Sequence, residues 1–129
     1  MELLDRAILD VLHERLMHDF GGALGVRGDA LIDAALARAV PRPGRADRAE
    51  LARLGACYGY GLAKKRGYLD GNRRLAAVAM GVFLLRNGFE LAAPEAELQM
   101  AMDAVESGDW SERELAAWIS DRAVERRPT

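Results

Sequence analysis

A basic, glycine-containing stretch near the middle of the chain holds the residues best suited to chemistry on an anion. It reads Arg66-Gly67-Tyr68-Leu69-Asp70-Gly71-Asn72-Arg73-Arg74 and runs into an apolar segment, residues 75–85. Glycine and asparagine accept unusual backbone angles, so the chain can turn tightly here and leave peptide N–H groups facing the loop. The apolar segment predicts a buried helix, whose first turn adds unpaired N–H donors and the positive end of a macrodipole.

These groups favour a ligand that carries phosphate. Arg73 and Arg74 have planar, permanently charged donors that fit phosphate oxygens, and further basic residues at 64–66 lie on the other side of the loop. A nucleotide polyphosphate is the predicted guest. Asp70 is then the nearby carboxylate that could hold a magnesium ion shared with the phosphates. The alternative is an ordinary solvated turn at a basic helix start.

The elements that must position this loop read as helices. Apolar periodicity, capping residues and Gly or Pro stops predict them from Leu4 to Phe20, from Asp29 to the prolines at 41 and 43, from Asp47 to Lys65, from Leu75 to Leu85, from Pro94 to Glu106, and from Ser111 onward. A brief extended piece is predicted at residues 89–91. The sequence therefore predicts an all-α fold, a compact bundle of about six helices around a buried central helix, in a single domain over residues 1–129.

Two further predictions concern the ends of the chain. The first helix is expected to bury one stripe at helical spacing: Ala7, Ile8, Val11, Leu12, Leu16 and Phe20. The last residues read as a fraying tail with solvated charges: Arg122, Arg126, Arg127 and Pro128.

Composition narrows the classes of function. The formal net charge is -2, which gives no overall reason to bind nucleic acid, and no apolar run reaches the roughly 20 residues that a membrane helix needs. Cys57 is the single cysteine and cannot form an internal disulfide; within an apolar helix it is expected to be a small core residue. With no export signal in the sequence, we expect a cytoplasmic protein.

Other catalytic patterns are missing from the sequence. No paired cysteines or His-Glu-x-x-His spacing suits zinc, and no glycine-rich Walker loop is present. None of Ser107, Ser111 and Ser120 lies in a nucleophile elbow. The basic loop is therefore the main chemical feature of the chain.

The loop resembles the signature of the Fic/Doc family, and in particular of its short death-on-curing (Doc) toxins. That signature is His, any residue, Phe, any residue, Asp, Ala or Gly, Asn, Lys, Arg. The matching residues of this chain, from the Phe onward, are Tyr68, Asp70, Gly71, Asn72, Arg73 and Arg74. Segments outside the loop also resemble Doc in the same order, among them residues 12–16, 20–22, 31–38 and 83–89.

The motif is degenerate, because Arg66 stands where the family has its histidine. In the family that histidine is the general base on the acceptor hydroxyl. A guanidinium with a pKa above about 12 cannot accept a proton, and loss of a general base costs on the order of 100- to 10,000-fold in rate. His13 or His18 could in principle supply a substitute base; a packing role is the simpler interpretation.

The resemblance implies a toxin of a toxin–antitoxin pair. It implies a kinase that phosphorylates elongation factor Tu with ATP and Mg²⁺ and so stops translation, here impaired by Arg66. Asp70 would hold the metal, and Gly71, Asn72, Arg73 and Arg74 the nucleotide. An antitoxin would dock as a helix in a hydrophobic groove. The alternatives are an inactive nucleotide- or antitoxin-binding module, an AMP transferase, and an enzyme in which Arg66 contacts the phosphate.

Overall fold

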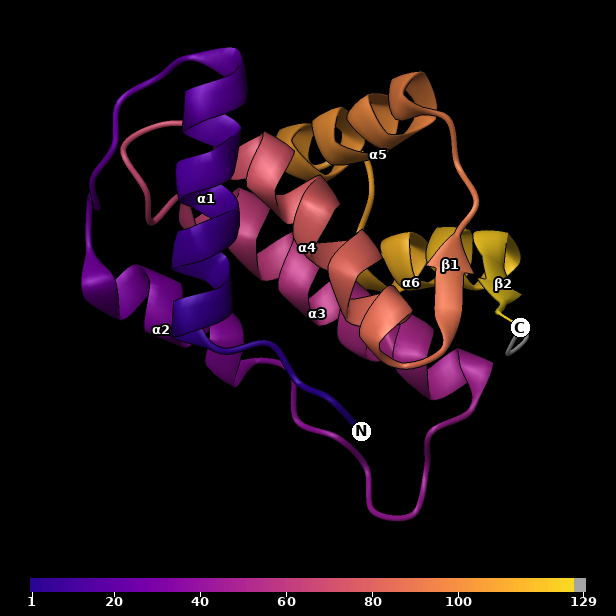
Figure 1. The fold of residues 1–129 in the computed structure, drawn as a ribbon. Coiled ribbons are helices and arrows are strands. Elements are labelled where there is room, and N and C mark those ends of the chain that lie inside the picture. Colours follow the sequence, from indigo (N-terminus) through magenta and orange to yellow (C-terminus); the bar gives the residue numbers. More distant parts are fainter. Residues whose placement is uncertain (127–129) are drawn as a thin grey trace.

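The computed structural model describes residues 1–126, which form six helices and one small sheet (Figure 1). The helices are α1 (Arg6–Phe20), α2 (Asp29–Ala37), α3 (Arg48–Lys65), α4 (Asn72–Arg86), α5 (Glu95–Ser107) and α6 (Glu112–Arg122). Strands β1 (Phe89–Leu91) and β2 (Ala123–Glu125) pair antiparallel, with Phe89 opposite Glu125. The predicted all-α bundle of about six helices is confirmed, and so is the extended piece at residues 89–91.

Helix α3 lies in the centre and packs against α2, α4 and α6. Asp47 caps its first turn by accepting from the Glu50 amide, and most of its side chains from Leu51 to Ala63 are buried, Cys57 among them. Gly59 explains the close approach of α4, because a Cβ there would collide with the Met80 side chain. Gly61 is likewise close to α2, where a Cβ would lie 3.2 Å from the Ala35 Cα, so these two glycines serve packing.

Helix α4 is buried on one side only, which corrects the expectation of a helix fully surrounded by others. Leu75, Ala76 and Phe83 are fully buried, whereas Ala77 and Val78 face a cavity and Leu85 is 44% exposed. The absence of a polar face thus does not imply complete burial; the second apolar face lines a hollow. Among residues 1–126 no helix, α4 included, has the length and apolar character to cross a membrane.

Helix α1 is rotated from the predicted stripe. Its buried residues are Leu9, His13, Leu16 and Met17, while Val11 is 67% and Phe20 58% exposed. The rotation brings His13 against the Tyr68 ring, with the ring centres 4.0 Å apart. The sequence pattern did not predict this because apolar periodicity gives no weight to a buried histidine. Helix α2 begins at Asp29, as predicted; its N-cap is Gly28, and Asp29 lies in the first turn.

The predicted fraying tail is wrong for the residues that the structure describes. Arg122 belongs to α6, donates from Nε to Glu97 at 3.1 Å and lies 4.7 Å from the Trp118 ring centre. Strand β2 follows, and the Arg126 amide donates to the Gly88 carbonyl. Pairing with β1 orders this segment, and such long-range pairing leaves no local trace in three-residue strands. Arg127 and Pro128 lie outside the described residues.

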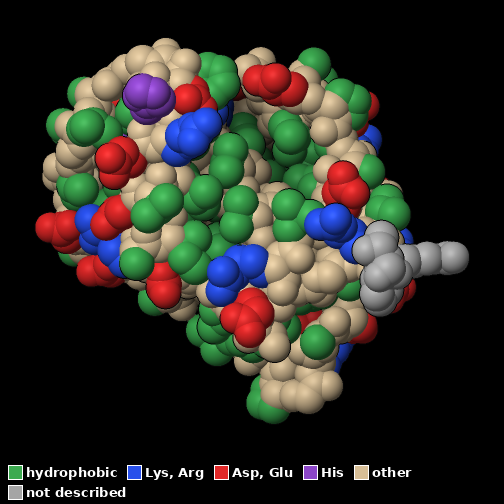
Figure 2. Space-filling model, viewed as in Figure 1, with side chains coloured by type: hydrophobic (Ala, Val, Ile, Leu, Met, Phe, Trp, Pro, Cys, Tyr) green, Lys and Arg blue, Asp and Glu red, His purple; other side chains and the backbone are tan. Residues whose placement is uncertain are grey.

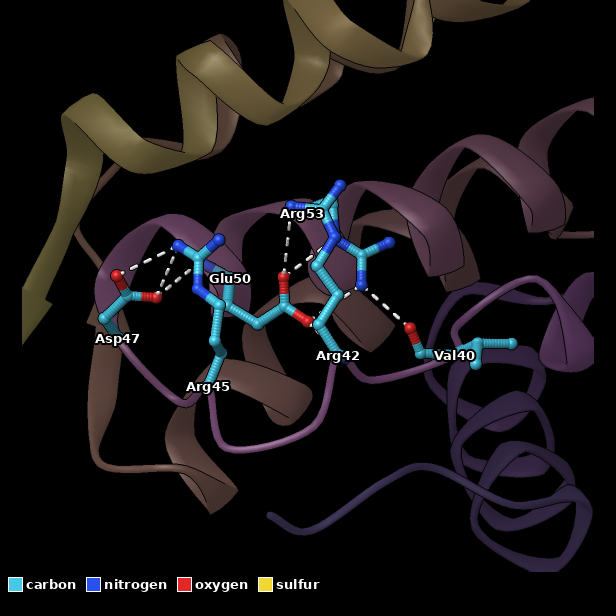
Figure 3. Close-up of polar contacts among 6 residues, drawn as sticks. All are labelled: Val40, Arg42, Arg45, Asp47, Glu50 and Arg53. Atoms are coloured by element: carbon cyan, nitrogen blue, oxygen red, sulfur yellow. Dashed lines mark hydrogen bonds and ion pairs between the residues drawn. The ribbon is translucent and has the colours of Figure 1, made fainter.

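A buried carboxylate fastens the linker between α2 and α3 (Figure 3). The Glu50 side chain is fully buried; it accepts two bonds from Arg53 at 2.8 Å and one from the Arg42 amide at 2.7 Å. Arg53 also donates to the Val40 carbonyl. These bonds, led by those from Arg53, lower the pKa of Glu50 from its ordinary value of 4.5 to about 2.

We expect Glu50→Gln to lower the free energy of unfolding by roughly 3 kcal/mol at pH 7, because it breaks a buried ion pair. Since the folded pKa lies below the unfolded one, the ionised Glu50 stabilises the fold above about pH 4.5, and this contribution is lost as the pH falls towards 2. Urea unfolding at several pH values measures both effects. A difference between the two proteins that stays constant from pH 7 to pH 2 would contradict the assignment, and Arg45→Gln at the exposed linker serves as the control.

Candidate functional site

The basic loop, residues 66–74, connects α3 to α4 and includes the first residues of α4. A second loop, residues 21–28, holds it in place. Arg66 ends α3 in the left-handed conformation (φ 51°), and Gly71 begins α4 with φ 76°. The Leu69 amide donates to the Gly25 carbonyl at 3.1 Å, and the Arg27 amide to the Gly67 carbonyl at 2.7 Å. The two loops therefore run antiparallel, and the second fixes the path of the first.

Asn72 closes the basic loop from within. Its side chain is buried; Oδ1 accepts from the Tyr68 amide at 3.0 Å, and Nδ2 donates to the Tyr68 carbonyl at 2.9 Å. Both ends of the carboxamide are thus bonded to backbone. Asn72 is among the residues that line the cavity, and its side chain acts as a clamp on the loop.

Tyr68 anchors the loop by burying its ring. The ring is 2% exposed, and its hydroxyl donates to Asp10 on α1 at 2.6 Å. Burial, together with this bond, raises the pKa of Tyr68 above its ordinary value, so the hydroxyl stays protonated near neutral pH. Arg6 also donates to Asp10 and reaches Asp29 on α2, so a chain of polar contacts links α2, α1 and the loop.

The two histidines are not placed as substitute bases. His13 is 3% exposed, stacks on Tyr68, and has Nε2 at 2.8 Å from the Asp70 carbonyl oxygen. His18 lies exposed on the last turn of α1. Neither residue is among those that line the cavity beside the loop. His13 therefore supports the loop backbone, and the packing interpretation fits the geometry.

A cavity of about 800 Å³ opens beside the loop, between α1, α4, β1 and α5. Figure 2 shows this face hollowed between α1 and α5, with hydrophobic side chains gathered over α4. All the residues predicted for the site line this cavity: Arg66, Asp70, Gly71, Asn72, Arg73 and Arg74. Its volume lies in the range of pockets that hold small ligands, roughly 300 to 1,000 Å³.

Carboxylates of α5 face the loop arginines across the cavity, a feature that sequence reasoning missed. Arg66 Nη1 lies 3.1 Å from Glu106 Oε1, and Arg73 Nε lies 3.9 Å from Glu106 Oε2. Arg73 also pairs with Asp103. The acidic residues at positions 103 and 106 follow α-helical spacing, but only the packing of α5 on α4 brings them to the loop.

Arg74 faces the other end of the cavity. Its guanidinium lies 4.0 Å from the Phe20 ring centre and 4.0 Å from Glu95. Three arginines and five carboxylates line the cavity. The carboxylates are those of Asp70, Glu90, Glu95, Asp103 and Glu106. The site is therefore not an electropositive pocket, and an anionic ligand must arrive with its own cation or replace some of these ion pairs.

Asp70 fits the predicted magnesium role as a single carboxylate. Its Oδ2 accepts from the Ala23 amide at 3.2 Å, and its side chain lines the cavity. Within residues 1–126 no cluster of three or more possible metal ligands exists. Mg²⁺ commonly binds through one or two carboxylates plus substrate phosphates, so the arrangement suits a metal that arrives with a nucleotide.

Fold and site together define a helical protein that presents a basic loop at the start of α4, beside a cavity of ligand size. The model of the Fic/DOC family matches residues 3–84, more than half of the chain, and this range includes the whole loop. The chain therefore belongs to the Fic/DOC family. A search of curated proteins gave no match to it.

We expect Asn72→Ala to lower the free energy of unfolding by about 1 to 3 kcal/mol, because two buried backbone groups of Tyr68 lose their partners. Asn72→Asp keeps an acceptor for the Tyr68 amide, so we expect its free energy of unfolding to lie between those of Asn72→Ala and the unaltered protein. Thermal unfolding measures the difference. Equal stability of Asn72→Ala and the unaltered protein would show that the clamp is not needed.

We expect Asp103→Asn to strengthen binding of pyrophosphate about fivefold at low salt, since a unit charge near 4 Å in water is worth about 1 kcal/mol. The gain should shrink at high ionic strength. Calorimetric titration measures it, with the exposed Asp109→Asn as the matched control. An unchanged dissociation constant would mean that Arg73 is not a phosphate contact.

Proposed function

We propose that this protein is a Doc-type toxin with a degenerate motif, which transfers the γ-phosphate of magnesium–ATP to elongation factor Tu in the cytoplasm and so stops translation. The proposal rests on the family and on one observation. The motif residues from Asp70 to Arg74 converge on one side of a cavity large enough for a nucleotide, at the start of α4. Backbone donors, guanidinium groups and one carboxylate thus meet where a polyphosphate would be held.

Arg66 sets the expected rate. Its backbone caps α3, and its guanidinium is engaged by Glu106. A guanidinium cannot take the proton of an attacking hydroxyl. Transfer is therefore expected to be slower than with a histidine at this position, by up to the 100- to 10,000-fold that a general base contributes.

Two other functions of the same site are tested together with this one. A binding module would hold nucleotide without transfer, and an AMP transferase would pass on the α-phosphate and not the γ-phosphate. The ion pairs between Arg66, Arg73 and α5 are what would favour the binding module, because they occupy the groups that a reacting phosphate needs.

The test is transfer of label from magnesium–ATP, carried separately on the γ- and the α-phosphate, to purified elongation factor Tu. We expect slow transfer of the γ-label, loss of transfer in Asp70→Ala, and faster transfer in Arg66→His. Transfer of the α-label would identify an AMP transferase. Binding of magnesium–ATP with no transfer even by Arg66→His would identify a binding module or a different target.

A partner helix is the second part of the proposal, because the cavity floor is apolar. Val78, Leu85, Leu91 and Leu98 line it, and so does Gly81. Such a floor suits an antitoxin segment that docks as an amphipathic helix. Glu90 and Glu95 at the end away from Arg66 favour basic residues at the matching end of that helix.

Gly81→Leu tests this docking. No heavy atom lies within 4 Å of a Cβ built at Gly81, and Gly81 lines the cavity, so a larger side chain there should occupy part of it. Replacing glycine inside a helix should stabilise the fold by about 0.5 to 1 kcal/mol. We expect higher thermal stability together with loss of binding to helical peptides that carry leucines on one face and lysines at one end. Peptide binding by Gly81→Leu equal to that of the unaltered protein would contradict docking of a helix in this cavity.

A further inference from the structure

Transfer to a hydroxyl needs a group that accepts its proton, and Arg66 cannot be that group. The histidines lie outside the cavity, one of them buried against Tyr68. The side chains that line the cavity and can accept a proton at neutral pH are its carboxylates. The group that accepts the proton during transfer must therefore be one of these carboxylates.

Geometry separates Glu106 from the other four. Asp70 is assigned to the metal, and within residues 1–126 Asp103 pairs with Arg73 alone. Glu90 and Glu95 lie on β1 and at the start of α5, where Glu95 contacts Arg74. Glu106 alone touches arginines on both sides of the loop, Arg66 through Oε1 and Arg73 through Oε2. Its side chain is one third exposed, so an incoming hydroxyl can reach it.

We infer that Glu106 is the general base of the transfer reaction, held in place by Arg66. This inference rests on the proposed function. The acceptor hydroxyl donates to the Glu106 carboxylate while Arg73 contacts the phosphate beside it. The hydroxyl oxygen forms a bond to the γ-phosphorus, the bond from that phosphorus to the bridging oxygen breaks, and ADP leaves with the electron pair. The proton passes to Glu106. A carboxylate performs the same task in protein kinases.

The ion pairs allow a competing role, in which Glu106 merely occupies the phosphate contacts. The two roles give opposite results for Glu106→Gln. A general base predicts a loss of transfer on the order of 100-fold or more, with magnesium–ATP binding unchanged or tighter. A competitor predicts that binding and transfer both increase. Glu97→Gln is the matched control, because Glu97 lies on the same helix, outside the cavity, and pairs with Arg122.

The experiment measures the magnesium–ATP dissociation constant by calorimetry and γ-label transfer to elongation factor Tu for the unaltered protein, Glu106→Gln and Glu97→Gln. A third variant combines Arg66→His with Glu106→Gln and should regain transfer, because an imidazole then supplies another proton acceptor. Regained transfer would also show that Glu106→Gln does not prevent folding. Transfer by Glu106→Gln equal to or above the unaltered protein would overturn the inference, as would magnesium–ATP binding without any transfer by the unaltered protein. Absence of magnesium–ATP binding would instead overturn the proposed function.

Discussion

The clamp between Asn72 and the backbone of Tyr68 is the contact on which the site depends. The first residue of α4 bonds both polar groups of the fourth residue before it, so the loop can close only in one form. That closure directs the Tyr68 ring into the core and leaves Asp70, Arg73 and Arg74 facing the cavity. A buried amide with both ends satisfied is rigid, because breaking either bond strands a polar group away from water.

The second constraint is electrostatic and comes from α5. The loop is basic in sequence, yet the cavity around it carries more carboxylates than arginines. Each loop arginine therefore has a carboxylate partner before any ligand arrives. Such partly exposed pairs contribute little to stability but decide which charges a ligand meets. If the proposed function holds, this balance favours a metal-bound nucleotide over a bare anion.

The sequence predicted the elements whose signals are local. Helices α3 and α6 begin as expected beside Asp47 and Ser111, whose side chains cap the first turn. The loop residues were found because their types and order are contiguous. The predictions that were wrong depend on contacts between residues distant in sequence. They concern the rotation of α1 towards Tyr68, the pairing of β2 with β1, and the open side of α4. The ion pair between Glu106 and Arg66 belongs to this group, since the two residues are 40 positions apart in the sequence.

The Tyr68 hydroxyl makes the two partners of its hydrogen bond to Asp10 unequal in the cost of their replacement. Its partner Asp10 is half exposed and also bonded to Arg6, so a phenylalanine at position 68 would leave the carboxylate satisfied by the guanidinium and by water. The reverse step is costly, because losing Asp10 would leave a buried hydroxyl without an acceptor. Removing Asp10 is therefore the costlier of the two changes, and its cost falls once the ring at position 68 carries no hydroxyl.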